Sequence, residues 1–232
     1  MVLVIFDVDG TLVYSDRADS RCFADTYQSV YQRPFPTIDW RQYPHVSDTT
    51  IFKNVIEQHF DRTPDAAEEA AFRQKFTNNI TLNRQRTPER FHCVPHAPRM
   101  IRRLLQDDRF RVGVATGGWT APARVKMNFV GIPHEDLVVT GADGKITRDD
   151  IINDTMIKAG GRKQYDHVVY VGDAIWDFQT TRRMRMPLIG IRHRGDVEFF
   201  HQLGVSQVLI DYENYEQFLN YCLHPEPVPS GH

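Results

Sequence analysis

The 232-residue sequence has few cysteines, no long apolar segment and almost no net charge. Its three cysteines, at positions 22, 93 and 222, are far apart and form no CxxC pair, which argues against a disulfide framework or a zinc site and favours a reducing compartment. The first residues do not show the basic segment, long apolar run and cleavage site of a secretory leader, and no apolar run reaches about 18 residues. We therefore expect a cytoplasmic protein that does not enter a membrane. The formal net charge of −2 provides no basic field for binding nucleic acid.

The N-terminal segment MVLVIFDVDGTL is the most informative part of the chain. Residues 2–6 form a short, apolar, β-branched run that is typical of a strand buried on both faces, and Asp7 and Asp9 follow it directly. Two carboxylates this close together repel one another unless a cation or a proton offsets their charge. Mg²⁺ suits such a place because it prefers hard oxygen ligands and leaves room for a substrate phosphate. A strand that simply ends in an Asp-Gly turn is the alternative reading of these few residues.

A helical block is predicted between residues 15 and 90. Apolar residues recur at helical spacing after Ala18, after Ser47 and after Asp65, and no buried-strand run interrupts them. A block of about 75 residues is too long for a crossover between neighbouring strands. We therefore interpret residues 15–90 as a cap inserted after the first strand, residues 1–14 and 91–223 as the core, and the proline-rich residues 224–232 as a flexible tail.

The remainder of the chain alternates between strand and helix patterns. Apolar strand runs are predicted at residues 110–115, 137–139, 167–171, 188–191 and 208–210, and helical patterns separate most of them. This alternation is typical of an α/β fold with a doubly wound parallel sheet. The predicted fold class is thus a Rossmann-like α/β core with a small all-helical domain inserted into it.

Polar residues follow two further strands of the predicted sheet. Thr116 and Gly117 come after the run at 110–115, and Asp173 and Asp177 come after the run at 167–171. Parallel strands bring their carboxyl ends to one edge of a sheet, so these residues should converge on Asp7. Each motif alone could be a turn or a helix cap. Three of them in this order, each after an apolar strand, are hard to produce by chance.

From residue 2 to about residue 191 the chain resembles the haloacid dehalogenase superfamily, in particular the phosphatases whose helical cap lies between the first and second motifs. The resemblance implies that Asp7 is a nucleophile that forms an aspartyl-phosphate. It implies that Asp9 protonates the leaving group and then activates water. Thr116 and the backbone amide of Gly117 would hold the phosphoryl oxygens.

The same resemblance implies a magnesium site and a cap that selects the substrate. Asp173, a carboxylate oxygen of Asp7 and the backbone carbonyl of Asp9 would ligate Mg²⁺, and Asp177 would support the water shell of the metal or the phosphate-binding cation. Residues 15–90 would set the choice of leaving group without contributing a catalytic carboxylate. The expected substrate is a small phosphorylated metabolite, and the expected assembly is a monomer or a weak homodimer.

The phosphate-binding cation has two candidates. The family places a lysine, usually followed by proline, before the helix that precedes the fourth strand, and this chain has Gly144-Lys145-Ile146-Thr147-Arg148 there without the proline. Lys145 keeps the residue type, whereas Arg148 fits the helix register better and can grip phosphate with two nitrogens. Lys158 lies inside the helix and is less suited. The sequence leaves Lys145 and Arg148 about equal.

Several functions remain open at this point. The first is a Mg²⁺-dependent phosphatase, and a sugar-phosphate mutase would use the same aspartates. A phosphonate hydrolase would need a lysine in the cap, where only Lys53 and Lys75 occur. A dehalogenase is disfavoured because that branch lacks the second carboxylate, which Asp9 supplies. A non-catalytic module that accepts a phosphoryl group is the alternative from a different class.

Overall fold

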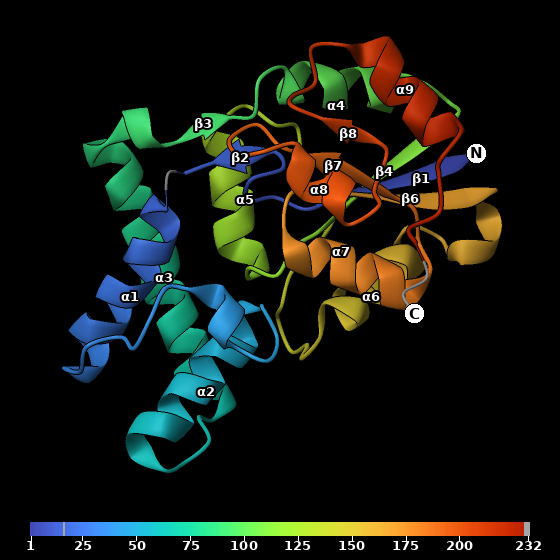
Figure 1. Ribbon diagram of the computed structural model, residues 1–232. Helices are drawn as coiled ribbons and strands as arrows, with labels where there is room; N and C mark the ends of the chain where they lie inside the picture. Colours follow the sequence, from blue (N-terminus) through green and yellow to red (C-terminus); the bar gives the residue numbers. More distant parts are fainter. Residues whose placement is uncertain (16, 230–232) are drawn as a thin grey trace.

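The computed structural model describes residues 1–15 and 17–229, and a six-stranded parallel sheet lies at its centre (Figure 1). The strands lie in the order β5-β4-β1-β6-β7-β8. Their bounds are β1 Val2–Phe6, β4 Phe110–Ala115, β5 Val138–Thr140, β6 His167–Gly172, β7 Leu188–Ile191 and β8 Val208–Leu209. The predicted α/β class and the predicted strands are confirmed.

The central strand β1 is buried on both faces, as its unbroken apolar sequence predicts. Leu3 and Ile5 pack into one hydrophobic cluster, and Val4 and Phe6 pack into the other. In Figure 1, α4 (Ala97–Leu105) and α9 (Tyr215–Leu223) lie above the sheet, and α6 (Arg148–Lys158) and α7 (Ile175–Met184) lie below it. The two remaining core helices are α5 (Thr120–Phe129) and α8 (Glu198–Gln202). This double cover explains why a parallel strand needs no polar face.

The register of β1 decides which loops meet at the sheet edge. Phe6 pairs with Val114 of β4 on one side and with Val171 of β6 on the other. The next residue, Asp7, donates its N–H to the Val171 carbonyl at 2.9 Å. The loops that leave β4 and β6 therefore begin on either side of Asp7, at the carboxyl edge where ligands bind in this class of fold.

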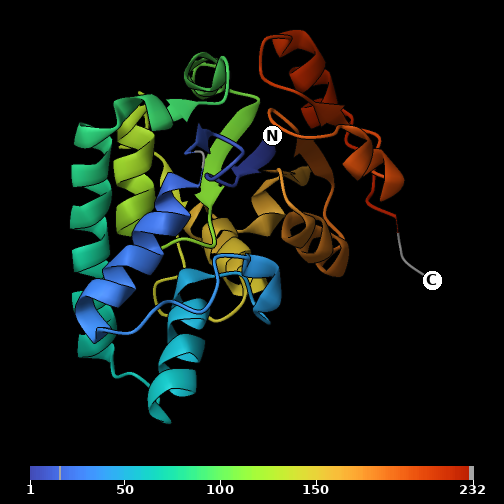
Figure 2. The same ribbon diagram turned by 60° about the vertical axis from the view of Figure 1, so that its left-hand side comes forward.

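Three helices form an insertion between two short strands, β2 (Val13–Tyr14) and β3 (His92–Cys93), which pair antiparallel. The helices are α1 (Ala18–Tyr31), α2 (Asp48–Phe60) and α3 (Ala66–Arg86), and we call residues 18–86 the helical insertion. Figure 2 shows them, coloured blue to teal, gathered beside the sheet. They lie within the range that the sequence assigns to a cap, and the β2–β3 pair is where the chain enters and leaves it.

Aromatic side chains join the helical insertion to the core. Trp119, at the start of α5, is fully buried, and its ring stacks on Phe23 of α1 at 5.8 Å. Phe52 and Phe72 stack on one another at 4.6 Å and both contact Trp119. The insertion thus shares a hydrophobic core with one face of the sheet, which holds it over the carboxyl edge.

The segment after α9 contacts the loop before β8. Gln207 donates to the His224 carbonyl at 2.8 Å and accepts from the Glu226 backbone N–H at 3.1 Å. The sequence predicted a flexible tail over residues 224–232, of which 230–232 lie outside the described residues. None of the described helices is both long and apolar enough to cross a membrane.

Candidate active site

A pocket of about 430 Å³ opens between the carboxyl edge of the sheet and the helical insertion. Asp7 and Asp9 line it, directly after β1. Gly10 allows the tight turn that follows, because its φ is +85° and a Cβ there would lie 2.1 Å from an oxygen of Asp173. The turn at Gly10 therefore packs closely against Asp173, which directly follows β6.

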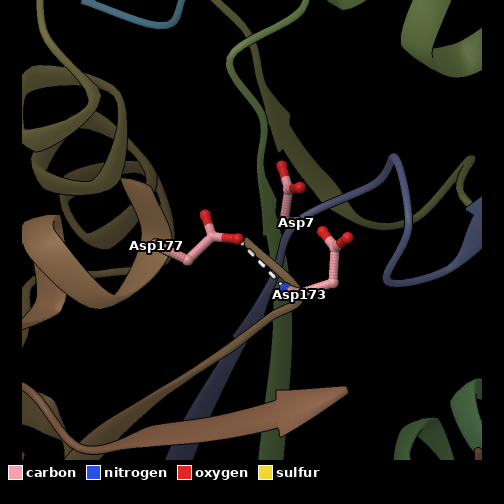
Figure 3. Close-up of side chains that lie close together, drawn as sticks. All are labelled: Asp7, Asp173 and Asp177. Atoms are coloured by element: carbon pink, nitrogen blue, oxygen red, sulfur yellow. Dashed lines mark hydrogen bonds between the residues drawn. The ribbon is translucent and has the colours of Figure 1, made fainter. Parts of the chain in front are cut away.

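The carboxylates of Asp7, Asp173 and Asp177 lie around one point (Figure 3). Each offers an oxygen, and these oxygens lie within 4.8 Å of one another. Asp177 is fully buried, and its Oδ2 accepts the backbone N–H groups of Asp173 and Ala174, both at 3.0 Å. Asp177 thus fixes the loop that presents Asp173 to Asp7.

The donor set fits a hard divalent cation. The Oδ1 of Asp173 is buried and has no hydrogen-bond partner among the described residues. A buried carboxylate oxygen without a partner is costly, and a cation would satisfy it. Carboxylate oxygens alone, with neither histidine nor cysteine, are the ligand type of Mg²⁺ or Ca²⁺.

Of the two candidate cations, Arg148 is the one that the structure brings to this cluster. It is buried at the first position of α6, and its Nη2 lies 2.6 Å from Asp177 Oδ1, 3.3 Å from Asp7 Oδ1 and 3.0 Å from the Tyr170 hydroxyl. Lys145 lies elsewhere, since its Nζ pairs with Asp154 at 2.9 Å and donates to the Asp143 carbonyl. Of the two candidates for the phosphate-binding cation, Arg148 therefore lies beside the carboxylate cluster and Lys145 does not.

Thr116 and Gly117 follow β4 and line the same pocket. The Thr116 backbone N–H donates to the Thr140 carbonyl, and its Oγ1 accepts the N–H of Gly118 at 3.2 Å. A Cβ on Gly117 would lie 2.4 Å from a guanidinium nitrogen of Arg148 and 2.5 Å from the Val46 carbonyl. Glycine is therefore required here for the close approach of Arg148 and the helical insertion.

Burial shifts the pKa values of the carboxyl groups in the cluster. Burial raises the pKa of Asp7 to about 7, and the neighbouring charge of Asp177 adds to this while Arg148 opposes it. Burial, together with the charges of Asp177 and Asp7, also raises the pKa of Asp173 well above its ordinary value. Desolvation raises the pKa of Asp9 to about 6, although Lys126 opposes the rise. A bound cation would favour the ionised form of each of these groups.

Among the charged residues of the pocket that sequence reasoning missed are Lys126 and Asp19. Lys126 Nζ lies 2.6 and 2.5 Å from the two carboxylate oxygens of Asp9, and 3.4 Å from Oδ2 of Asp19 in the helical insertion. The sequence did contain a signal for Lys126, because it shares the buried face of α5 with Ala123 and Met127. A lysine on the apolar face of a helix indicates a buried partner.

The helical insertion also contributes a second carboxylate, that of Asp48, to the lining of the pocket. Asp48 lines the pocket, where its backbone N–H donates to the Gly117 carbonyl at 2.8 Å and its Oδ2 accepts the Trp119 N–H at 2.9 Å. The adjacent Thr49 accepts the Trp119 Nε1–H and donates to the Ala142 carbonyl, both at 2.8 Å. The first turn of α2 is therefore docked on the core loops after β4 and β5.

The family follows from a match over most of the sequence. Residues 4–191 match the family model described as haloacid dehalogenase-like hydrolase, so the chain belongs to this family of hydrolases. No curated protein sequence shows significant similarity to the chain.

Solved structures of similar fold cover nearly the whole chain. A hydrolase from Pseudomonas syringae aligns with a TM-score of 0.66 and 16% identity, covering 95% of this chain and 98% of that one. CbbY from Rhodobacter sphaeroides, in complex with phosphate, aligns with a TM-score of 0.65 and 16% identity over 91% and 95%. A putative beta-phosphoglucomutase from Thermotoga maritima aligns with a TM-score of 0.57 and 17% identity over 95% and 99%. At these identities the likeness establishes the shared fold.

Proposed function

We propose that the protein is a Mg²⁺-dependent phosphatase that hydrolyses a small phosphate monoester through an aspartyl-phosphate on Asp7. The observation that carries the proposal is that Asp7 lies beside both Arg148 and Asp173, whose Oδ1 has no hydrogen-bond partner among the described residues. When a carboxylate attacks a phosphoryl group, a nearby cation is needed to stabilise the negative charge on the phosphoryl oxygens in the transition state. The phosphate found in complex with CbbY of the same fold is consistent with this proposal.

In the first step, Oδ of Asp7 forms a bond to phosphorus as the bond from phosphorus to the leaving oxygen breaks. The carboxyl group of Asp9 donates its proton to that leaving oxygen. Thr116 and the Gly117 amide hold the phosphoryl oxygens, and Arg148 neutralises part of their charge. Asp177 accepts hydrogen bonds from the Arg148 guanidinium and from the backbone N–H of Asp173, and so keeps Arg148 and Asp173 in place.

In the second step, water attacks phosphorus and the acyl-phosphate bond breaks, which restores the Asp7 carboxylate. The proton of the water passes to Asp9, so that the group which acted as an acid now acts as a base. Asp7, Asp173 and the backbone carbonyl of Asp9 would hold Mg²⁺, which supplies positive charge beside the transferred phosphoryl group when it is bound. Ester and water are thereby converted to alcohol and inorganic phosphate.

The helical insertion, which we propose acts as a cap, determines which esters enter. Phe23, Trp40 and Phe76 line the pocket on the side away from the sheet. These side chains contact the leaving group and exclude bulk water. The phosphonate-hydrolase alternative loses support, because neither Lys53 nor Lys75 is among the described residues that line the pocket.

The experiment is a screen of small phosphate esters for release of inorganic phosphate, with Mg²⁺ and with a chelator. We expect many turnovers per chain with Mg²⁺ and none with the chelator, and Asp7→Asn should abolish turnover while the protein stays folded. Asp136→Asn, an exposed aspartate outside the pocket, is the matched control. Release of one phosphate per chain would indicate a phospho-acceptor module, and a tenth of the wild-type rate in Asp7→Asn would rule out the assigned nucleophile.

A further inference from the structure

Lys126 is a buried charge that the proposed reaction steps do not use. Its side chain is 5% exposed, and its ammonium group lies between the carboxylates of Asp9 and Asp19. Asp19 is itself held, since its Oδ1 accepts the Ser15 hydroxyl at 2.6 Å. The three charged groups come from three places: the loop after β1, the last turn of α5 in the core, and the first turn of α1 in the helical insertion.

A buried lysine between two carboxylates costs folding free energy, so its presence points to a role at the site. Burying an ammonium group costs several kcal/mol, which well-placed carboxylates only offset. On stability alone, an apolar side chain would serve α5 as well, because Ala123 and Met127 on the same face pack into the hydrophobic core. The lysine therefore does something that packing does not require.

We infer that Lys126 is a positioning residue, which holds the Asp9 carboxylate in place for proton transfer and links it to Asp19 of the helical insertion. The Asp9 side chain is 35% exposed at the pocket and follows a strand end, so it can adopt other rotamers. Contacts of Nζ to both carboxylate oxygens restrict it to one. The inference rests on the proposed function, in which Asp9 donates its proton to the leaving oxygen, and a proton donor must lie within hydrogen-bond reach of its acceptor.

The competing role for Lys126 is that of a second phosphate ligand beside Arg148. The two roles differ in their dependence on the leaving group. A misplaced proton donor slows only those esters whose leaving oxygen needs the proton, whereas a lost phosphate ligand slows all esters alike.

The test is kcat/KM for Lys126→Gln on substituted phenyl phosphates with increasingly basic leaving groups, and on acetyl phosphate, whose leaving group needs no proton. Because kcat/KM covers the steps up to formation of the aspartyl-phosphate, it isolates the first proton transfer. We expect a loss of about 30-fold or more for the most basic phenol, and of less than about 5-fold for acetyl phosphate. The first figure lies below the roughly 10²–10⁴-fold that a general acid supplies, because the variant displaces Asp9 without removing it. Asp9→Asn should give the same trend, more strongly.

Two further variants keep the result interpretable. Glutamine preserves a hydrogen-bond donor between the carboxylates, and Lys126→Met serves as a second variant if Lys126→Gln does not fold. Lys158→Met is the matched control, because Lys158 also pairs with a carboxylate, Asp154 at 2.9 Å, but lies outside the pocket.

The outcomes separate the inference from the proposed function. If the wild type releases no phosphate from any of these esters, the proposed function is wrong and the inference falls with it. If the wild type turns over and Lys126→Gln loses the same factor on every ester, the inference alone is wrong. An equal loss together with weaker inhibition by inorganic phosphate would make Lys126 a phosphate ligand.

Discussion

Replacing Arg148 by alanine should disable the site and destabilise the fold, whereas Lys145→Ala should do neither. Arg148 is buried, and one nitrogen contacts both Asp177 and Asp7. Its loss removes a preorganised positive charge beside the transferred phosphoryl group, which typically costs on the order of 10²–10³-fold in kcat. The same loss leaves Asp177 fully buried without a cation, and breaking a buried ion pair from one side costs about 3–5 kcal/mol. We expect the lower end, because the other oxygen of Asp177 keeps two backbone N–H donors.

Lys145→Ala is the matched control, because it removes a cation that lies three residues before Arg148 in the sequence. Its ion pair with Asp154 is partly exposed and is worth at most about 1 kcal/mol. Lys158 also contacts Asp154 at 2.9 Å and continues to pair with it in the variant. Activity of Lys145→Ala should therefore stay within about 3-fold of the wild type, far from the loss expected when a preorganised cation is removed.

The assay is steady-state release of phosphate from the best ester, at a temperature where urea unfolding shows each variant to be folded. Arg148→Lys separates the effect of charge from that of shape, because it keeps the charge but cannot reach Asp177, Asp7 and Tyr170 together. Its rate of phosphate release should lie between those of the wild type and Arg148→Ala. The reasoning is refuted if Lys145→Ala loses activity as severely as Arg148→Ala, or if Arg148→Ala keeps a tenth of wild-type kcat.

Two further predictions concern the docking of α2. Burial raises the pKa of Asp48 from 3.8 to about 7, so between these pH values the folded protein holds a proton that the unfolded chain has released. The free energy of unfolding of the wild type should therefore fall as pH rises from about 4 to about 7. The difference in free energy of unfolding, Asp48→Asn minus wild type, should rise across this window by at most about 1.4 kcal/mol per pH unit, as measured by urea unfolding. A difference that stays constant with pH would contradict this. Thr49→Val leaves the buried Trp119 Nε1–H without its acceptor and should lower the free energy of unfolding by about 1–3 kcal/mol. The exposed control Thr63→Val should change it by less than about 0.5 kcal/mol. Equal effects of the two substitutions would refute the role of Thr49 in docking α2.

The fold class could be predicted from local patterns because each pattern has a direct physical cause. An apolar run such as residues 2–6 must be covered on both faces, and the alternation of such runs with helices leaves few arrangements other than a parallel sheet. The convergence of Asp7, Thr116 and Asp173 follows from the same rule, since parallel strands end at one edge. The sequence alone therefore determined the fold class and the family.

Tertiary structure decided which charged side chains face the pocket. Lys145 and Arg148 lie three residues apart at a helix start, and only the folded α6 directs Arg148 to Asp7 and Lys145 to Asp154. No spacing along the chain connects Lys126 with Asp9, which lie 117 positions apart and meet because the fold brings α5 to the loop after β1. Asp19 and Asp48 reach the site because the aromatic packing around Trp119 holds the helical insertion there. A short-range pattern can indicate that a lysine such as Lys126 is buried, but which carboxylates it meets depends on long-range packing and domain docking.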